Sequence, residues 1–136
     1  MRLKPSLRIL YILLAVSWVV NGAWMLFTPH HWFVTIPGAS DTGPFNHHLV
    51  RDFGVCFVLI GAAALIALVR GTFSYTYHAW ILAFFALHGA VHVWELMSGH
   101  TASHIWWRAF PWVFSETILL VLLSLPQAWQ KQEVRE

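Results

Sequence analysis

The sequence predicts an all-α integral membrane protein, a four-helix bundle with up-down topology. Of its 136 residues, 58% are hydrophobic and only 10% are charged, whereas soluble domains carry about 25% charged residues. The apolar residues form four runs of about 20 residues, the length that a helix needs to cross about 30 Å of hydrocarbon. These runs fill the chain, so we expect a single transmembrane domain over residues 1–136.

The first helix is expected over residues 7–27, and an outer linker over residues 28–46. Basic residues precede the first apolar run as in a signal peptide, but the run is too long for one and no cleavage site follows it. The linker holds three Pro and two Gly, which argue against a continuous helix. A short surface helix or a re-entrant turn remains an alternative there.

The other three helices are expected over residues 47–69, 75–98 and 106–125. Pro111 falls in the first turns of the last helix, and Pro126 marks its end. Gly54 and Gly61, seven residues apart, indicate a close helix contact along the second helix.

The orientation follows from the basic residues, which favour the cytoplasmic side of a membrane. They lie mainly in the N-terminal tail, at Arg70 after the second helix, and at Lys131 and Arg135 in the C-terminal tail. Both termini are therefore predicted to be cytoplasmic, in a bacterial inner membrane. The slight basic excess is explained by this topology, so no nucleic-acid partner is expected.

Ionisable side chains concentrate in the outer half of this predicted bundle. At 1.5 Å per residue from the outer helix ends, they form three layers: His48 and Glu95 at about 3–5 Å, Asp52 and His92 at about 9 Å, and His88 and Glu116 at about 15 Å. An Asp at the centre of a membrane helix costs about 3 kcal/mol, and ionisable groups at membrane depth are usually paired and functional. Matched depths on separate helices therefore predict one shared polar site.

Two motifs carry this site, HxxxD at residues 48–52 and HxxxHxxE at residues 88–95. Each places its polar residues on one helix face, and imidazole with carboxylate suits zinc, iron or copper. The predicted metal ligands are His48, His88, His92 and Glu95, and the predicted catalytic residues are Asp52 and Glu116. An enzyme of this kind is a metal-dependent hydrolase or an oxidoreductase, acting on a lipid-like or quinone substrate.

Two alternatives use the same residues. In the first, the protein is a non-enzymatic accessory subunit of a larger membrane complex, and the polar residues are interhelical clamps such as Arg51 with Glu95 or Asp52. In the second, histidines on facing helices hold haem b for electron transfer, although carboxylates beside the ligands are unusual in an apolar haem pocket. Expected partners are membrane lipids and either further copies of the chain or a larger complex.

Two resemblances accompany these motifs. The linker PHHWFVTIPG at residues 29–38, followed by RDFGVCFVLIG at residues 51–61, is similar to small bacterial four-helix membrane proteins of the DoxX-like group, some of which are linked to quinone-coupled thiosulfate oxidation. HxxxD on one helix with HxxxH on another resembles the CREST membrane hydrolases by convergence. That second resemblance implies His48, His88 and His92 as zinc ligands and Asp52 as acid/base.

Overall fold

The computed structural model describes residues 1–130 as a helical protein with one very short two-stranded ribbon. The elements are β1 (Arg2–Leu3), α1 (Pro5–Phe27), α2 (Pro29–Thr35), η1 (Ala39–Asp41), α3 (His47–Val69), α4 (Tyr75–Met97), α5 (Ser103–Leu123), η2 (Pro126–Ala128) and β2 (Trp129–Gln130). Four of them, α1, α3, α4 and α5, are long and apolar enough to cross a membrane. The prediction of four long apolar helices is confirmed, and the side of the membrane on which each end lies stays a prediction.

The helix ends follow local sequence signals. Pro5 occupies the first turn of α1, where its missing N–H costs no hydrogen bond, so this helix begins earlier than expected. The Asn46 side chain accepts hydrogen bonds from the backbone N–H groups of His48 and Leu49 and caps α3. The start of α5 at Ser103 and its end at Leu123 each lie slightly earlier in the chain than the prediction.

The linker contains the short helix that the sequence left as an alternative. Helix α2 begins at Pro29 and ends at Thr35, because the residue before Pro37 is disfavoured in helical conformation. The Trp32 indole Nε1 donates a 2.9 Å hydrogen bond to Asn21 Oδ1 on α1. This bond holds α2 against the end of the first span.

Helices α1 and α3 pack backbone against backbone. A Cβ placed on Gly54 would lie 2.8 Å from the carbonyl oxygen of Gly22, and one placed on Gly61 would lie 2.6 Å from that of Ala15. No side chain fits at such contacts, so small residues are required along this seam. The close contact predicted from Gly54 and Gly61 is confirmed.

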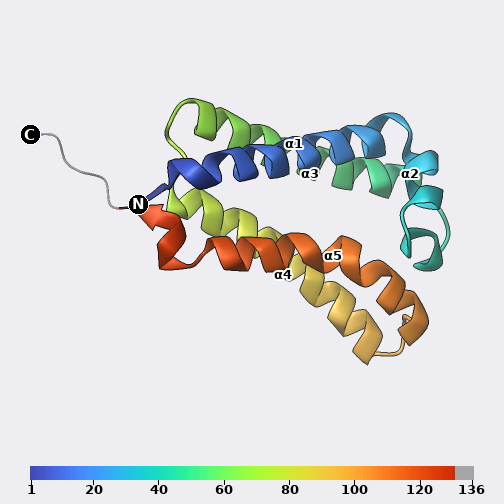
Figure 1. Ribbon diagram of the computed structural model, residues 1–136. Coiled ribbons are helices and arrows are strands. Elements are labelled where there is room, and N and C mark those ends of the chain that lie inside the picture. The colour runs from blue at the N-terminus through green and yellow to red at the C-terminus, as the bar shows by residue number, and fades with distance from the viewer. Residues whose placement is uncertain (131–136) are drawn as a thin grey trace, which may run out of the picture.

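Helices α4 and α5 form a second pair, which meets the first mainly at one end (Figure 1). Within this pair, Thr117 Oγ1 donates a hydrogen bond to the Phe85 carbonyl oxygen, and Gly89 lies against the Phe114 ring. We call the end that holds Tyr11, His78 and Trp129 the joined end. Toward α2, the pair α4–α5 diverges from α1 and α3, and we call that end the splayed end (Figure 1).

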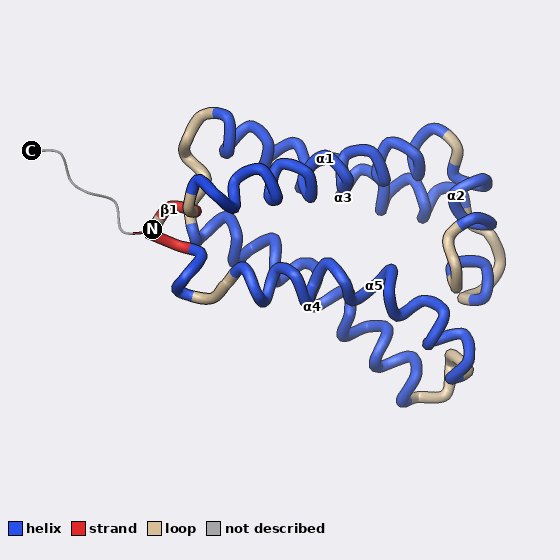
Figure 2. Tube along the Cα trace, in the orientation of Figure 1, coloured by secondary structure: helices blue, strands red, loops and turns tan. Residues whose placement is uncertain are grey.

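The joined end gathers segments from the whole described chain. Strand β1 pairs antiparallel with β2 in the register Leu3 to Trp129, and Arg2 forms a bridge with Ser74 beside α4. Figure 2 shows both strands at this end, next to the N-terminus. The first and last described segments therefore lie together, as an up-down bundle requires. Lys131 and Arg135, used above to orient the chain, lie outside the described residues.

Candidate functional site

The first of the two motifs lies on a face of α3 that no other helix covers. Gly54 and Gly61 turn toward α1, while Phe53 and Phe57 turn toward α4. Asp52 lies about 160° around the helix from Gly54, and so it points away from both neighbours. The side chains of His48 and Asp52 are 82% and 60% exposed.

Exposed apolar residues continue the same face along α3. We call it the free face of α3, and its residues are His48, Asp52, Val55, Leu59 and Ile66. In a membrane this face meets lipid or another protein, with one imidazole and one carboxylate near its splayed end.

The two polar groups on the free face are close but do not form a good hydrogen bond. His48 Nε2 lies 3.5 Å from Asp52 Oδ2, beyond the 2.7–3.2 Å that is usual for N–H···O bonds. Two ligands of one tetrahedral zinc ion, each about 2.0–2.1 Å from the metal, lie about 3.3 Å apart. The pair therefore already has the spacing of two ligands of one ion.

The second motif lies on the side of α4 that faces α3 and the bundle interior. The His88 ring is half-buried between Phe53 and Phe84, with ring centroids 5.9 and 6.5 Å away. The His92 ring centroid is 4.9 Å from that of His88, and Glu95 follows, also half-buried. These side chains point away from the free face of α3.

Glu116 lies on α5 and faces α1. Its carboxyl group is half-buried and within interaction range of the Trp18 indole. The indole N–H is buried without a hydrogen bond of ordinary geometry, so the two groups are neighbours rather than a well-formed pair. Trp18 also packs on Phe85 of α4, with ring centroids 5.1 Å apart. Glu116 therefore belongs to the interior layer at the middle of the bundle.

The six predicted site residues do not assemble into one site. His48 and Asp52 share the free face of α3, whereas the four others lie on faces of α4 and α5 turned to the interior. Among residues 1–130, no three His, Cys, Asp or Glu side chains lie close enough to hold one metal ion. A shared site within one chain was inferred from matched depth, which sets the height of a side chain but not its direction. The metal-binding prediction itself stays untested.

The predicted clamp by Arg51 takes another form. Arg51 Nε donates a 3.1 Å hydrogen bond to the carbonyl oxygen of Leu26 at the end of α1. A guanidinium bound to a helix C-terminal carbonyl is favourable, since that end of a helix is partially negative. This contact ties α3 to α1.

The best-formed polar group in the protein was not predicted, and it lies at the joined end. Tyr11 Oη lies 2.9 Å from His78 Nδ1, and His78 Nε2 lies 2.8 Å from Ser124 Oγ. Ser124 Oγ donates to the Leu120 carbonyl oxygen, so it accepts from His78 Nε2–H, and Nδ1 accepts from Tyr11. This assignment satisfies every polar atom of the chain Tyr11–His78–Ser124.

The hydrogen-bonded series Tyr11–His78–Ser124 links α1, α4 and the end of α5. The side chains packed around it leave no space for a substrate. Tyr11 and His78 are fully buried, packed among Phe73 and Trp129. Its partners come from α1, α4 and α5, so no spacing in the sequence reveals them. We therefore assign it to holding the joined end together.

No family model, curated protein or solved structure matches this chain. The DoxX-like and CREST resemblances therefore stay predictions, and function is argued from the geometry alone.

Proposed function

We propose that this protein is an integral membrane protein that binds a transition-metal ion between two copies of itself. The ligands are His48 and Asp52 of each copy, and zinc is the metal whose geometry fits best. The single observation that supports this proposal is the 3.5 Å separation of His48 Nε2 and Asp52 Oδ2 on an uncovered helix face.

The count of ligands favours a second copy. One chain offers only two neighbouring donors on the free face of α3, whereas a structural zinc site takes four. A two-fold axis along the membrane normal brings the same face of each copy together at the same depth. Two imidazoles and two carboxylates then surround one ion.

The membrane environment favours the same arrangement. Asp52 lies five residues after the start of α3, about 8 Å along the helix and close to the depth expected from the sequence. A carboxylate at that depth and facing lipid is costly, and such groups are normally paired or metal-bound. Binding a cation at the interface of two copies removes that cost.

This ligand set indicates what the ion does. Four protein ligands saturate tetrahedral zinc, whereas a catalytic zinc keeps one position for water. The proposed ion therefore holds two copies together. The predicted hydrolase or oxidoreductase chemistry requires an ion with an open position.

The metal content of the purified protein tests the proposal. Protein purified in detergent and dialysed against trace zinc should contain one zinc per two chains, measured by elemental analysis. His48→Ala and Asp52→Ala should each lose the metal, whereas His104→Ala, at an exposed histidine, should retain it. Metal-free wild-type protein, or metal retained in both ligand variants, contradicts the proposal.

Cross-linking tests the second copy directly. In a Cys56→Ser background, Leu59→Cys on the free face should form a disulfide-linked dimer in zinc, and a chelator should reduce its yield. Leu13→Cys is the matched control, because Leu13 and Leu59 are 62% and 63% exposed and Leu13 lies on α1. Equal dimer yields at both positions contradict the proposed interface.

A second candidate is the accessory subunit, which the splayed end of α4 favours. His92 and Glu95 are half-buried there and interact electrostatically with each other, but within residues 1–130 neither side chain has a hydrogen-bond partner. A partner helix that presents a cation or N–H donor to Glu95 would satisfy this carboxylate. Glu95→Gln should then release that partner from the purified complex, while His48→Ala should not. The haem alternative, with His47 or His48 facing His88 or His92, stays a prediction, although His48 points away from α4.

A further inference from the structure

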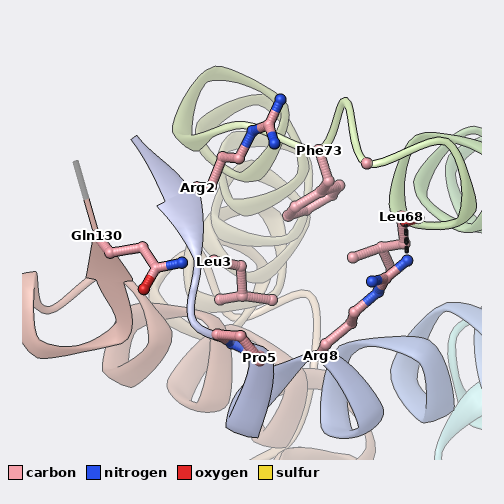
Figure 3. Close-up of a pocket in the computed structure, with 8 residues that line it drawn as sticks. Arg2, Leu3, Pro5, Arg8, Leu68, Phe73 and Gln130 are labelled. Atoms are coloured by element: carbon pink, nitrogen blue, oxygen red, sulfur yellow. Dashed lines mark hydrogen bonds between the residues drawn. The ribbon is translucent and has the colours of Figure 1, made fainter. Parts of the chain in front are cut away.

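A half-open pocket of about 200 Å³ lies at the joined end. Figure 3 shows its lining. The floor is apolar and buried, formed by Leu3, Leu68 and Phe73, and the rim carries Arg2, Arg8 and Gln130. The pocket is thus assembled from β1, α1, the end of α3, the turn that follows it, and β2.

The Arg8 guanidinium is held in place at this rim. Its Nη2 donates a 2.6 Å hydrogen bond to the Leu68 carbonyl oxygen, drawn as a dashed line in Figure 3. A guanidinium has five N–H donors in a planar fork, so this bond positions the group and leaves further donors for a ligand. Arg2 stands across the pocket on β1 (Figure 3).

Basic residues are concentrated at the joined end. Arg2, Lys4, Arg8 and Arg70 lie there, while Arg51, Arg108 and the carboxylates of residues 1–130 lie elsewhere. Those carboxylates are Asp41, Asp52, Glu95 and Glu116. The pocket therefore lies in a positive field at the level where apolar spans end.

We infer that this pocket binds the phosphate of an anionic phospholipid headgroup. Arginine suits a phosphate oxygen pair because its fork donates two parallel hydrogen bonds. Basic pockets between helices at a membrane surface bind anionic headgroups in this way. The apolar floor accommodates the glycerol and the first methylene groups.

A lipid fits the surroundings better than a free phosphate ion. The apolar floor of the pocket, formed by Leu3, Leu68 and Phe73, lies where the apolar spans end. The glycerol and first methylene groups of a lipid make apolar contacts there, whereas a free ion gains nothing from such a surface. The lipid site lies at the opposite end from His48 and Asp52, and it does not depend on the proposed metal.

Lipid binding to the full-length protein in detergent tests the inference. Native mass spectrometry and thermal unfolding should show that phosphatidylglycerol binds and stabilises the protein, while phosphatidylcholine and inorganic phosphate do not. Equal effects of phosphatidylcholine overturn the requirement for an anionic headgroup. Equal stabilisation by inorganic phosphate overturns the lipid as the ligand.

Variants at the rim locate the site. Arg8→Gln should weaken phosphatidylglycerol binding about tenfold, because it removes the charge-assisted hydrogen bonds of the guanidinium fork as well as the charge. Lys4→Gln removes the same charge at the same end but lies outside the pocket lining, and it should weaken binding clearly less. An equal loss of phosphatidylglycerol binding in both variants would contradict binding at a defined pocket. Arg8→Lys, which keeps the charge but loses the planar fork of donors, provides the same test if Arg8→Gln does not fold.

Discussion

The joined end and the splayed end differ in how their polar groups are used. At the joined end, Tyr11, His78 and Ser124 form a closed chain of hydrogen bonds with no donor left over. At the splayed end, the ionisable side chains are only partly covered, and Asp52 points away from its own bundle. The same four helices thus build one end whose polar groups are satisfied within the chain and one end whose ionisable side chains are left partly exposed.

The two ends differ in the segments that pack beside the helices there. The joined end receives both strands, and Trp129 packs into the core and donates its indole N–H to the Leu123 carbonyl oxygen. The splayed end receives the polar linker, whose contact with α5 is Gly38 against Ala109 and Arg108 beside Asp41. Aromatic packing brings the helix pairs together at one end, and exposed polar contacts allow them to diverge at the other.

The strongest test of this contrast is the loss of the His78 ring. We expect His78→Ala to destabilise the protein by about 3 kcal/mol, because it leaves a cavity and leaves the buried Tyr11 hydroxyl group without its hydrogen-bond acceptor. Unfolding in detergent, followed by circular dichroism, measures this loss. His104→Ala, at an exposed position of α5, should change stability by less than about 0.5 kcal/mol. Equal losses would mean that the joined end is no more tightly built than the splayed end.

The seam between α1 and α3 should remain tight even toward the splayed end. Gly22→Ala places a Cβ 2.6 Å from the Gly54 carbonyl oxygen, and we expect a loss of about 2 kcal/mol because backbone cannot move aside easily. Gly89→Ala is the control, since its Cβ would meet the edge of the Phe114 ring at 3.0 Å. That ring can rotate, so the same unfolding measurement should show a smaller loss. A larger loss of stability for Gly89→Ala would show that α4 and α5, rather than α1 and α3, form the more rigid pair.

Removing a single hydroxyl group at the joined end should have a smaller effect on stability. Tyr11→Phe keeps the packed ring but leaves His78 Nδ1 without its donor, and we expect a loss of about 1 kcal/mol. The double variant with Ser124→Ala should lose less than the sum of the two single variants if the three groups act as one chain. Additive losses would show that the bonds are independent.

The smallest effect is expected at the splayed end. Arg108 Nη1 and Asp41 Oδ2 are 3.5 Å apart, the Arg108 side chain is exposed and that of Asp41 is partly exposed, and Arg108→Gln should cost no more than about 0.3 kcal/mol. Its effect should instead appear in spin-label distances between the linker and α5, which should become more broadly distributed. An unchanged distribution would show that the Gly38–Ala109 contact alone holds the linker in place.

Particular residues show how far the sequence predicts the site. The close packing of Gly54 and Gly61 was predictable, since small residues a set number of turns apart lie on one helix face. The hydrogen-bonded chain around His78 was not predicted, because its partners come from helices far apart in the chain. The separation of Asp52 from His92 was likewise not predictable, since it depends on how far each helix is rotated about its own axis.

The sequence alone determined the four apolar helices and the height of each polar side chain along them. Both follow from properties of a single helix, namely its run of apolar residues and its rise per residue. Only the tertiary structure decided which way those side chains point. Helix rotation is set by side-chain packing between neighbours, and here the contact of Gly22 with Gly54 and the burial of His78 fix it. That rotation turned His48 and Asp52 outward and left His88 and His92 facing the interior.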